Sequence, residues 1–242
     1  MTDAPVAPRK RAARPRDAAS LVILDHRQGK PHVLMGRRNA AVKFLPGAYV
    51  FPGGRVDRQD HYAPYAGDLN EGTAARLLLD MKRGPSVRRA RGLALAAIRE
   101  TYEEAGMLVG RTGSATRSPS GMWEAFCSHG VVPDLSKMTY FARAITPPVR
   151  PKRFDTRFFA ISADQIAQSI DFDSRPDREL DTMEWIPISD VGDLKTVPIT
   201  QFVLSDLKGL LDSHSRIEPG CPVAYYQPHN REGRRQILDL PT

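Results

Sequence analysis

A single predicted helix, residues 93–105, constrains the fold of this chain more than any other segment. Its apolar residues recur with the spacing of an α-helix, and the residue that follows, Gly106, is typical of a helix C-cap. The apolar face is suited to packing on a sheet and consists of Leu95, Ile98, Tyr102 and Ala105. We therefore expect a sheet for this helix to cover.

The other face of this helix carries three carboxylates near its C-terminal end. Glu100, Glu103 and Glu104 are related as i, i+3 and i+4, so they project together and repel one another unless a cation lies among them. Arg99 can reach Glu103 one turn on and neutralise part of this charge. Oxygen ligands of this kind suit Mg²⁺ or Mn²⁺ rather than zinc. Taken alone, such a pattern is more often the solvated acidic end of a helix.

The remaining sequence predicts a mixed β-sheet sandwiched between helices, an α/β fold of the α+β type. Short apolar runs predict strands and amphipathic segments predict helices, without the regular alternation of a parallel sheet. The predicted strands are 21–24, 32–35, 49–51, 137–145, 154–161 and 182–186, and the further helices are 73–82, 163–170 and 200–213. We expect a single domain over residues 20–242.

Basic charge is concentrated in two groups, and the formal net charge is +7. Residues 1–19 hold five Lys and Arg against two Asp and few aliphatic residues, which predicts a disordered basic tail. The second group lies within residues 82–91. We favour a solvated tail over weak contact with nucleic acid or a membrane, and over a transit peptide. No apolar run approaches the ~18 residues of a membrane helix, and two cysteines suit a reducing compartment, so we expect cytoplasmic residence.

A second motif lies upstream of the carboxylates, in Phe51-Pro52-Gly53-Gly54. Two flexible residues end a predicted strand here, and their backbone carbonyls can face a metal ion. With this segment the chain resembles the Nudix hydrolases, whose signature is G-x5-E-x7-R-E-U-x-E-E-x-G-U, where U is a bulky aliphatic residue. The matching residues are Gly54, Arg99, Glu100, Glu103, Glu104, Gly106 and Met107, while Thr101 replaces an aliphatic residue.

The resemblance implies a Nudix fold and a metal-dependent diphosphatase that acts on a small nucleotide-type substrate. Mg²⁺ or Mn²⁺ would be bound by Glu100, Glu103, Glu104 and the Gly53 carbonyl. The implied catalytic residues are Arg99, Glu100 and Glu104. The sequence does not decide which carboxylate is the general base.

A long insertion interrupts the signature. Asp60 stands where the family has Glu, and about thirty extra residues, roughly 61–92, include a predicted helix and the second basic group. Interruptions at this point resemble the Nudix branch that cleaves coenzyme A and acyl-CoA. We expect the insertion either to cover an acyl-pantetheine arm or a 3′-phosphate, or to form an oligomer contact, as in a homodimer.

A second pattern favours the same branch, whose members carry L-L-T-x-R-[SA]-x3-R-x3-G-x3-F-P-G-G before the signature. In this chain the pattern is met at every spacing by Leu34, Met35, Gly36, Arg38, Asn39, Lys43, Gly47 and Phe51-Pro52-Gly53-Gly54, with Gly36, Asn39 and Lys43 as substitutions. The resemblance implies that Arg38, Lys43 and Gly54 contact substrate. Lys43 keeps the positive charge for a phosphate but lacks the planar fork of arginine.

Two downstream residues are further candidates. Arg157, in a strand that alternates charged and aromatic residues, is predicted to lie near an anionic substrate, and the alternative is ordinary alternation between core and solvent faces. Glu179 precedes a late strand where a further acid or base resides in the family, and its alternative is a surface carboxylate.

The resulting prediction is hydrolysis of a diphosphate bond in coenzyme A or acyl-CoA, giving 3′,5′-ADP and (acyl-)phosphopantetheine. One alternative is a Nudix hydrolase of ADP-ribose, NADH or another dinucleotide. The alternative of a different class is a catalytically silent Nudix-fold module that binds nucleic acid through the basic tail. Because the signature keeps all of its carboxylates, we favour the enzyme and do not expect a nucleic-acid or membrane partner.

Overall fold

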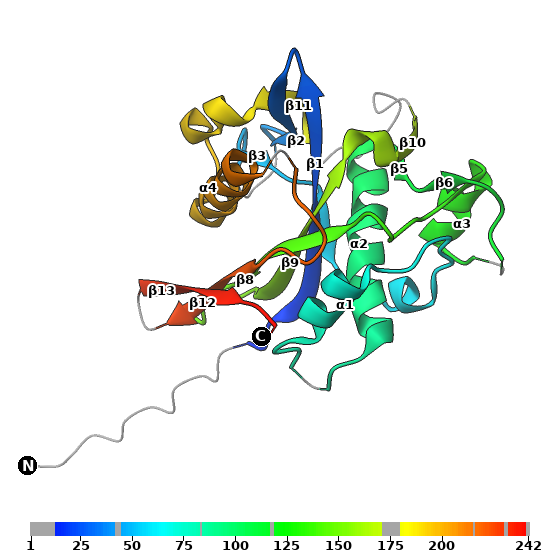
Figure 1. Ribbon diagram of the computed structural model, residues 1–242, viewed down its shortest axis with the longest axis horizontal. Coiled ribbons are helices and arrows are strands. Elements are labelled where there is room, and N and C mark those ends of the chain that lie inside the picture. Colours follow the sequence, from blue (N-terminus) through cyan, green and yellow to red (C-terminus); the bar gives the residue numbers. More distant parts are fainter. Residues whose placement is uncertain are drawn as a thin grey trace, which may run out of the picture.

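The structure, a computed structural model, describes residues 13–41, 45–82, 84–116, 119–170, 180–214, 216–229 and 232–240 (Figure 1). The strands of its central sheet are β1 (Arg16–Arg27), β2 (Lys30–Arg38), β3 (Tyr49–Val50), β4 (Gly53–Arg55), β8 (Thr139–Ile145), β9 (Phe154–Ser162), β11 (Leu180–Pro187), β12 (Val223–His229) and β13 (Glu232–Leu238). The main path is β11-β2-β1-β9-β8-β12-β13, with β3 paired to β2 and β4 to β1. β1 is parallel to β9 and β8 to β12, while β1 and β2 are antiparallel, so the sheet is mixed as predicted.

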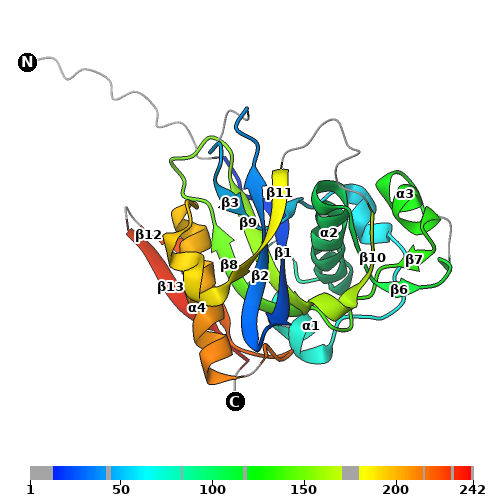
Figure 2. The same ribbon diagram turned by 90° about the horizontal axis from the view of Figure 1, so that it is seen from above.

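Helices cover both faces of this sheet (Figure 2). The helix that carries the glutamates, α2 (Val87–Ala105), lies on one face, and α4 (Pro198–Ser213) lies on the other. Successive residues of β1 divide between the two cores: Leu21 packs in the cluster that contains α2, and Val22 packs in the cluster that contains α4. The expected sheet between helices is confirmed.

The helix α2 begins earlier than its predicted start at residue 93. The Ser86 hydroxyl accepts a hydrogen bond from the Arg89 amide and caps the first turn, and Gly106 ends the helix with φ +67°. The first turns of α2 therefore lie within the predicted insertion. The preceding helix, α1, spans Glu71–Leu78 and is shorter than predicted.

The prediction of a helix over residues 163–170 was wrong. A short 3₁₀ turn, Ala163–Gln165, is followed by strand β10 (Ile166–Ser169), which pairs with β5 (Met107–Val109) directly after α2. The segment thus finds its backbone partners in another strand, a long-range contact that local helix propensity does not report. A small pair, β6 (Arg111–Thr112) and β7 (Val131–Val132), and helix α3 (Met122–Ser128) were also not predicted.

The predicted boundary between tail and domain at residue 20 needs correction. β1 begins at Arg16, and residues 16–19 pair with β9, so these residues belong to the sheet. The earlier part of the predicted basic tail, residues 1–12, lies outside the described residues.

The insertion packs on the sheet rather than standing apart from it. The Thr73 hydroxyl of α1 donates to the Met138 carbonyl at 3.1 Å, and Leu77 is buried in the core beneath α2. Figure 1 shows α1 beside the N-terminal end of α2, whereas β5 follows the glutamate-bearing end. The expectation that α1 covers a bound substrate arm is therefore not supported by its position.

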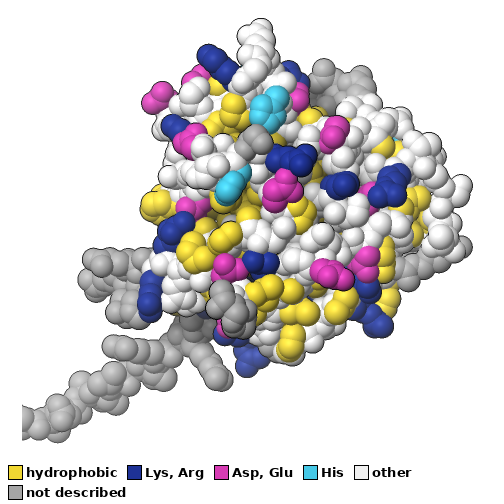
Figure 3. All heavy atoms as spheres, in the orientation of Figure 1, with side chains coloured by type: hydrophobic (Ala, Val, Ile, Leu, Met, Phe, Trp, Pro, Cys, Tyr) yellow, Lys and Arg dark blue, Asp and Glu magenta, His cyan; other side chains and the backbone are white. Residues whose placement is uncertain are grey.

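Basic residues of the insertion that the structure describes have partners within the chain. Arg89 binds both oxygens of Asp17, Arg91 pairs with Asp68, and Arg88 lies over the ring of Tyr62. Acidic and basic side chains are interspersed on the face drawn in Figure 3. Among the described residues, no helix has both the length and the apolar character needed to cross a bilayer.

Candidate active site

The C-terminal end of α2 brings together the residues of the predicted signature. Arg99 Nη1 lies 2.9 Å from a Glu100 oxygen and 3.0 Å from a Glu103 oxygen. Glu104 Oε2 accepts a hydrogen bond from the Gly53 amide of β4 at 3.0 Å. Arg99, the three glutamates and Gly53 are therefore neighbours, as the sequence predicts.

Arg99 is held in place by a buried anchor, Asp60. The Asp60 carboxylate is fully buried and accepts hydrogen bonds from Arg99 Nε at 2.9 Å, from Trp123 Nε1 at 3.1 Å and from the Asp57 amide at 2.8 Å. Arg99 also donates to the Arg55 carbonyl. Burial alone would lower the pKa of Arg99, but the hydrogen bonds and charge of Asp60 hold this pKa above its ordinary value. The insertion thus leaves the two halves of the signature in contact.

Two glycines allow strand β4 to approach this cluster closely. A Cβ atom on Gly54 would lie 2.4 Å from Glu100 Oε1, and a Cβ atom on Gly53 would lie 2.3 Å from the Ser20 hydroxyl. Glu100 therefore occupies the space that a side chain at residue 54 would need. Gly54 supports the site by making room for Glu100.

Replacing Gly54 by alanine should displace Glu100 and lower kcat of the predicted diphosphatase activity about 100-fold, the effect of a misplacement of about 1 Å. The matched control is Gly192→Ala, because a Cβ atom there meets nothing within 4 Å. Steady-state kinetics of both variants would check this expectation. Equal kcat values for the two would show that Glu100 does not need this position.

The Glu100 carboxyl has a raised pKa. Burial raises its pKa to about 7, and the charge of Glu103 acts in the same direction, although the nearby Arg99 opposes both. One arginine therefore does not compensate the negative charge gathered here. An added cation would relieve this repulsion.

The donor set fits a hard divalent cation, because three carboxylates lie within about one turn of a helix. Within the described part of the chain, no three His, Cys, Asp or Glu side chains form a ready metal site. The reason is that Glu103 pairs with Arg99 and Glu104 accepts from the Gly53 amide. These carboxylates would exchange their present partners for the ion. The predicted Gly53 carbonyl ligand remains a prediction, since the contact seen at Gly53 is made by its amide.

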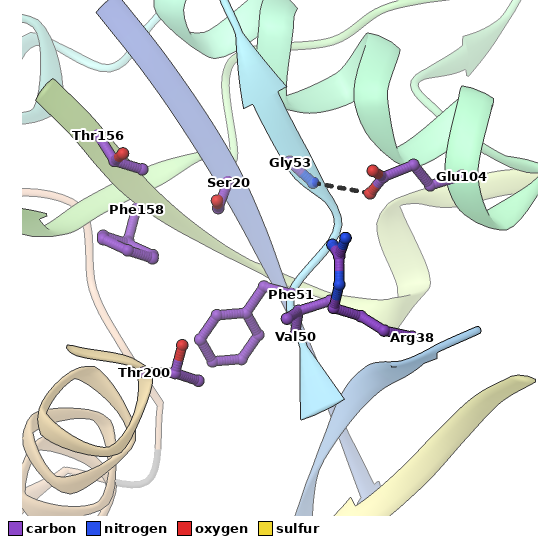
Figure 4. A pocket seen from close by; sticks show the side chains of 9 residues that line it. All are labelled: Ser20, Arg38, Val50, Phe51, Gly53, Glu104, Thr156, Phe158 and Thr200. Carbon is purple, nitrogen blue, oxygen red and sulfur yellow. Dashed lines mark hydrogen bonds between the residues drawn. The ribbon is translucent and has the colours of Figure 1, made fainter. Parts of the chain in front are cut away.

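A cavity of about 200 Å³ opens beside Glu104 (Figure 4). Arg38, the last residue of β2, extends along its wall toward Gly53 and Glu104 (Figure 4). The cavity is lined by Ser20, Arg38, Val50, Phe51, Gly53, Glu104, Thr156, Phe158 and Thr200. The structure therefore brings the predicted substrate residue Arg38 to the same space as Glu104.

The structure explains why two positions of the upstream pattern, Gly47 and Gly36, are occupied by glycine. Gly47 has φ +69°, a conformation that favours glycine, and its amide donates to the Arg38 carbonyl. At Gly36 a Cβ atom would lie 2.4 Å from Leu180 Cδ1, which accounts for glycine where the pattern has threonine. Lys43 and Glu179, predicted to bind substrate and to act as acid or base, lie outside the described residues.

The prediction that Arg157 contacts substrate is corrected by the structure. Its side chain is 1% exposed and pairs with Asp17 and Asp155, on the face of β9 opposite to the cavity residues Thr156 and Phe158. Arg143 joins the same buried group through Asp155, at 2.7 Å. Arg157 therefore belongs to a buried ion-pair network, in line with ordinary alternation along a strand.

Four polar residues of the site were not predicted from the sequence. Trp123 supports Asp60 from α3, and Ser20, Thr156 and Thr200 line the cavity. A signal was available for Ser20, a small polar residue directly before the apolar run 21–24. Trp123 is 63 residues from its partner, and no local pattern indicates that contact.

Comparisons with known proteins bear on the fold of this chain. No protein-family model matches the chain. The Caenorhabditis elegans protein named "Putative nudix hydrolase 7" is 28% identical over 161 residues, which are 62% of this chain and 45% of that protein. The chain thus spans less than half the length of this relative.

The chain is also similar to proteins of solved structure. A NUDIX hydrolase from Alicyclobacillus acidocaldarius is 28% identical, with a TM-score of 0.59 over 79% of this chain and 90% of that one. The NUDIX domain of Shewanella oneidensis NrtR, solved with ADP ribose, is 10% identical with a TM-score of 0.47, over 82% and 90% of the two chains. The first of these likenesses establishes the Nudix fold.

Proposed function

We propose that this chain, which has the Nudix fold and resembles Nudix hydrolases, is a metal-dependent Nudix diphosphatase. It would hydrolyse a diphosphate bond in a nucleoside diphosphate derivative. The observation that carries this proposal is that Glu104, on the helix end where Arg99 pairs with Glu100 and Glu103, lines the same cavity as the cation of Arg38.

The proposed chemistry begins with charge neutralisation, since the oxygens of a diphosphate repel an attacking hydroxide. Glu100, Glu103 and Glu104 would hold Mg²⁺ or Mn²⁺, which acidifies water and neutralises phosphate charge when bound. Arg99, fixed by Asp60, keeps Glu100 and Glu103 in position. Arg38 would neutralise a phosphate from the cavity wall, and Glu104 would take the proton of the attacking water, because it is the glutamate that lines the cavity.

The substrate we propose is coenzyme A or acyl-CoA, cleaved to 3′,5′-ADP and (acyl-)phosphopantetheine. Support comes from the upstream pattern, since Arg38, Phe51 and Gly53 all line the cavity. The turn that contains Gly47 is hydrogen-bonded directly to Arg38. The pattern thus describes one wall of the candidate site.

The test is mass-spectrometric product analysis with Mg²⁺ or Mn²⁺ and a panel of coenzyme A, acetyl-CoA, a long-chain acyl-CoA, ADP-ribose and NADH. We expect release of 3′,5′-ADP from coenzyme A or its esters. EDTA and the Glu104→Gln variant, purified in the same way, should give no product. If AMP is released from ADP-ribose or NADH and coenzyme A and its esters give no product, the chain is still a diphosphatase but the coenzyme A assignment is overturned. No product from any compound would overturn the enzyme and favour a nucleic-acid-binding module.

A further inference from the structure

Three hydroxyl groups face the cavity beyond Glu104. They belong to Ser20 of β1, Thr156 of β9 and Thr200 of α4, and they lie around the rings of Phe51 and Phe158 (Figure 4). The β-sheet register brings Ser20 next to Phe158 and Gly53, so the hydroxyl end of the cavity is continuous with the carboxylate end.

These hydroxyls lack hydrogen-bond partners within the described chain. Among the described residues, none donates to or accepts from the side chains of Ser20, Thr156 or Thr200, although Thr200 is only 6% exposed. Ser20 and Thr156 are half-buried, so all three hydroxyls lie at the cavity surface rather than inside the apolar core. Together they offer donors and acceptors to a ligand that enters the cavity.

The polar character is confined to the cavity. On the same face, Val22 lies two residues after Ser20 in β1, and Ala160 lies two residues after Phe158 in β9. Val203 lies about one turn after Thr200 in α4, and all three apolar residues are buried. The apolar core thus resumes directly beside the hydroxyls. Polar residues in these positions are therefore a property of the cavity rather than of the surrounding packing.

The chemistry of the lining beside Thr156 and Thr200 suits a hydroxyl-bearing group. Of the described residues that line the cavity, Arg38 and Glu104 are the charged ones, and both lie near Gly53 rather than near Thr156 and Thr200 (Figure 4). Hydroxyl side chains donate and accept, as sugar hydroxyls do. The volume of about 200 Å³ is below the ~300 Å³ at which pockets for whole small molecules begin, so the cavity holds part of a ligand.

We propose that this cavity binds the ribose of the substrate's nucleoside, and that Thr200, with Ser20 and Thr156, determines the preference for a ribonucleotide. The inference rests on the proposed function, because the ribose is attached to the phosphate that Arg38 and Glu104 would engage. The feature recognised would be the 2′-hydroxyl of the adenosine ribose, which coenzyme A, ADP-ribose and NADH have in common, since the 3′-hydroxyl of coenzyme A carries a phosphate.

The test compares Thr200→Val, which keeps the shape of the side chain, with Ser205→Ala, an exposed hydroxyl on the same helix. Isothermal titration calorimetry would measure the affinity of each protein for AMP and for 2′-deoxy-AMP. We expect the wild type to bind AMP more tightly than 2′-deoxy-AMP. Thr200→Val should weaken AMP binding about tenfold, the effect of one lost hydrogen bond, and reduce the preference for AMP. Ser205→Ala should match the wild type.

Kinetics on the substrate that the wild type hydrolyses provide the second readout. Thr200→Val should raise KM and leave kcat within about twofold, because the interaction is made equally in the ground and transition states. Thr156→Val and Ser20→Ala provide the same comparison if Thr200→Val unfolds.

Three outcomes would overturn the inference. The first is equal affinity of Thr200→Val and the wild type for AMP, and the second is a wild type that does not prefer AMP over 2′-deoxy-AMP. The third is a Thr200→Val variant in which phosphopantetheine inhibits more weakly than in the wild type while the nucleotide product inhibits equally well. Failure of the proposed function would be seen differently, as a wild type that hydrolyses no substrate, while the calorimetry still decides whether the ribose binds here.

Discussion

Glu100→Gln should lower kcat at least about 100-fold and, without metal, make the protein more stable at pH 8. The loss of activity follows from the metal-binding role proposed for Glu100, because an amide cannot replace a charged ligand and even weaker changes around metal ligands lower activity about 10- to 100-fold. The gain in stability follows from burial of this carboxylate, which raises its pKa to about 7. The side chain at residue 100 thus supports function at the expense of stability.

The sign of the pH effect follows from linkage. A carboxyl with a raised pKa binds its proton more tightly in the folded state, so its contribution is most favourable below the unfolded value of 4.5 and is lost as pH rises to about 7. A shift of this size corresponds to about 3 kcal/mol. The stability difference between Glu100→Gln and wild type should therefore grow between pH 4.5 and 7 and then level off.

Urea unfolding in EDTA at pH 5 and pH 8 would measure this difference. The control is Glu218→Gln, since Glu218 is an exposed partner of Arg216 and its loss should change stability by less than about 0.5 kcal/mol. A Glu100→Gln variant no more stable than wild type at pH 8, or a difference independent of pH, would contradict the prediction.

Asp60→Ala should destabilise the protein by about 3–5 kcal/mol, because it leaves Arg99 charged and buried without its main partner. Trp123 Nε1 and the Asp57 amide would also lose their acceptor. In a chain of this size the melting temperature should fall by about 10 °C. Activity should fall as well, since Arg99 positions Glu100 and Glu103.

Differential scanning calorimetry of Asp60→Ala and Asp25→Ala would check this expectation. Asp25 also pairs with an arginine, Arg27, but both side chains are exposed, so its removal should have little effect. Equal melting temperatures for the two variants would mean that the buried pair does not hold the two halves of the site together.

Local patterns were sufficient to predict the carboxylate helix and most of the strands. The face of Glu100, Glu103 and Glu104 follows from spacing alone, and the cap at Gly106 follows from residue type. The early start of α2 was missed because the charged residues after Ser86 were assigned to the insertion. The helix predicted at residue 163 failed because pairing with β5 outweighs local propensity there.

Within the site, residues on α2 were predictable and long-range contacts were not. The motif places Asp60 near Arg99, but its burial and its bond to Trp123 depend on the folded insertion. Arg157 was misassigned because an alternating strand does not reveal which face is turned toward the ligand. The place of Thr200 at the cavity depends on the packing of α4 against the sheet, which no local pattern reports.

The parallel pairing of β1 with β9 has a consequence for synthesis of the chain. Strand β1 lies inside the sheet, yet residues 16–24 pair with residues 154–162. At the usual rate of translation, about 5–20 residues per second, β1 leaves the ribosome roughly ten seconds or more before this partner exists. Its apolar edge is exposed during that time, so nascent chains stalled before residue 162 should be the most prone to aggregation and to capture by chaperones.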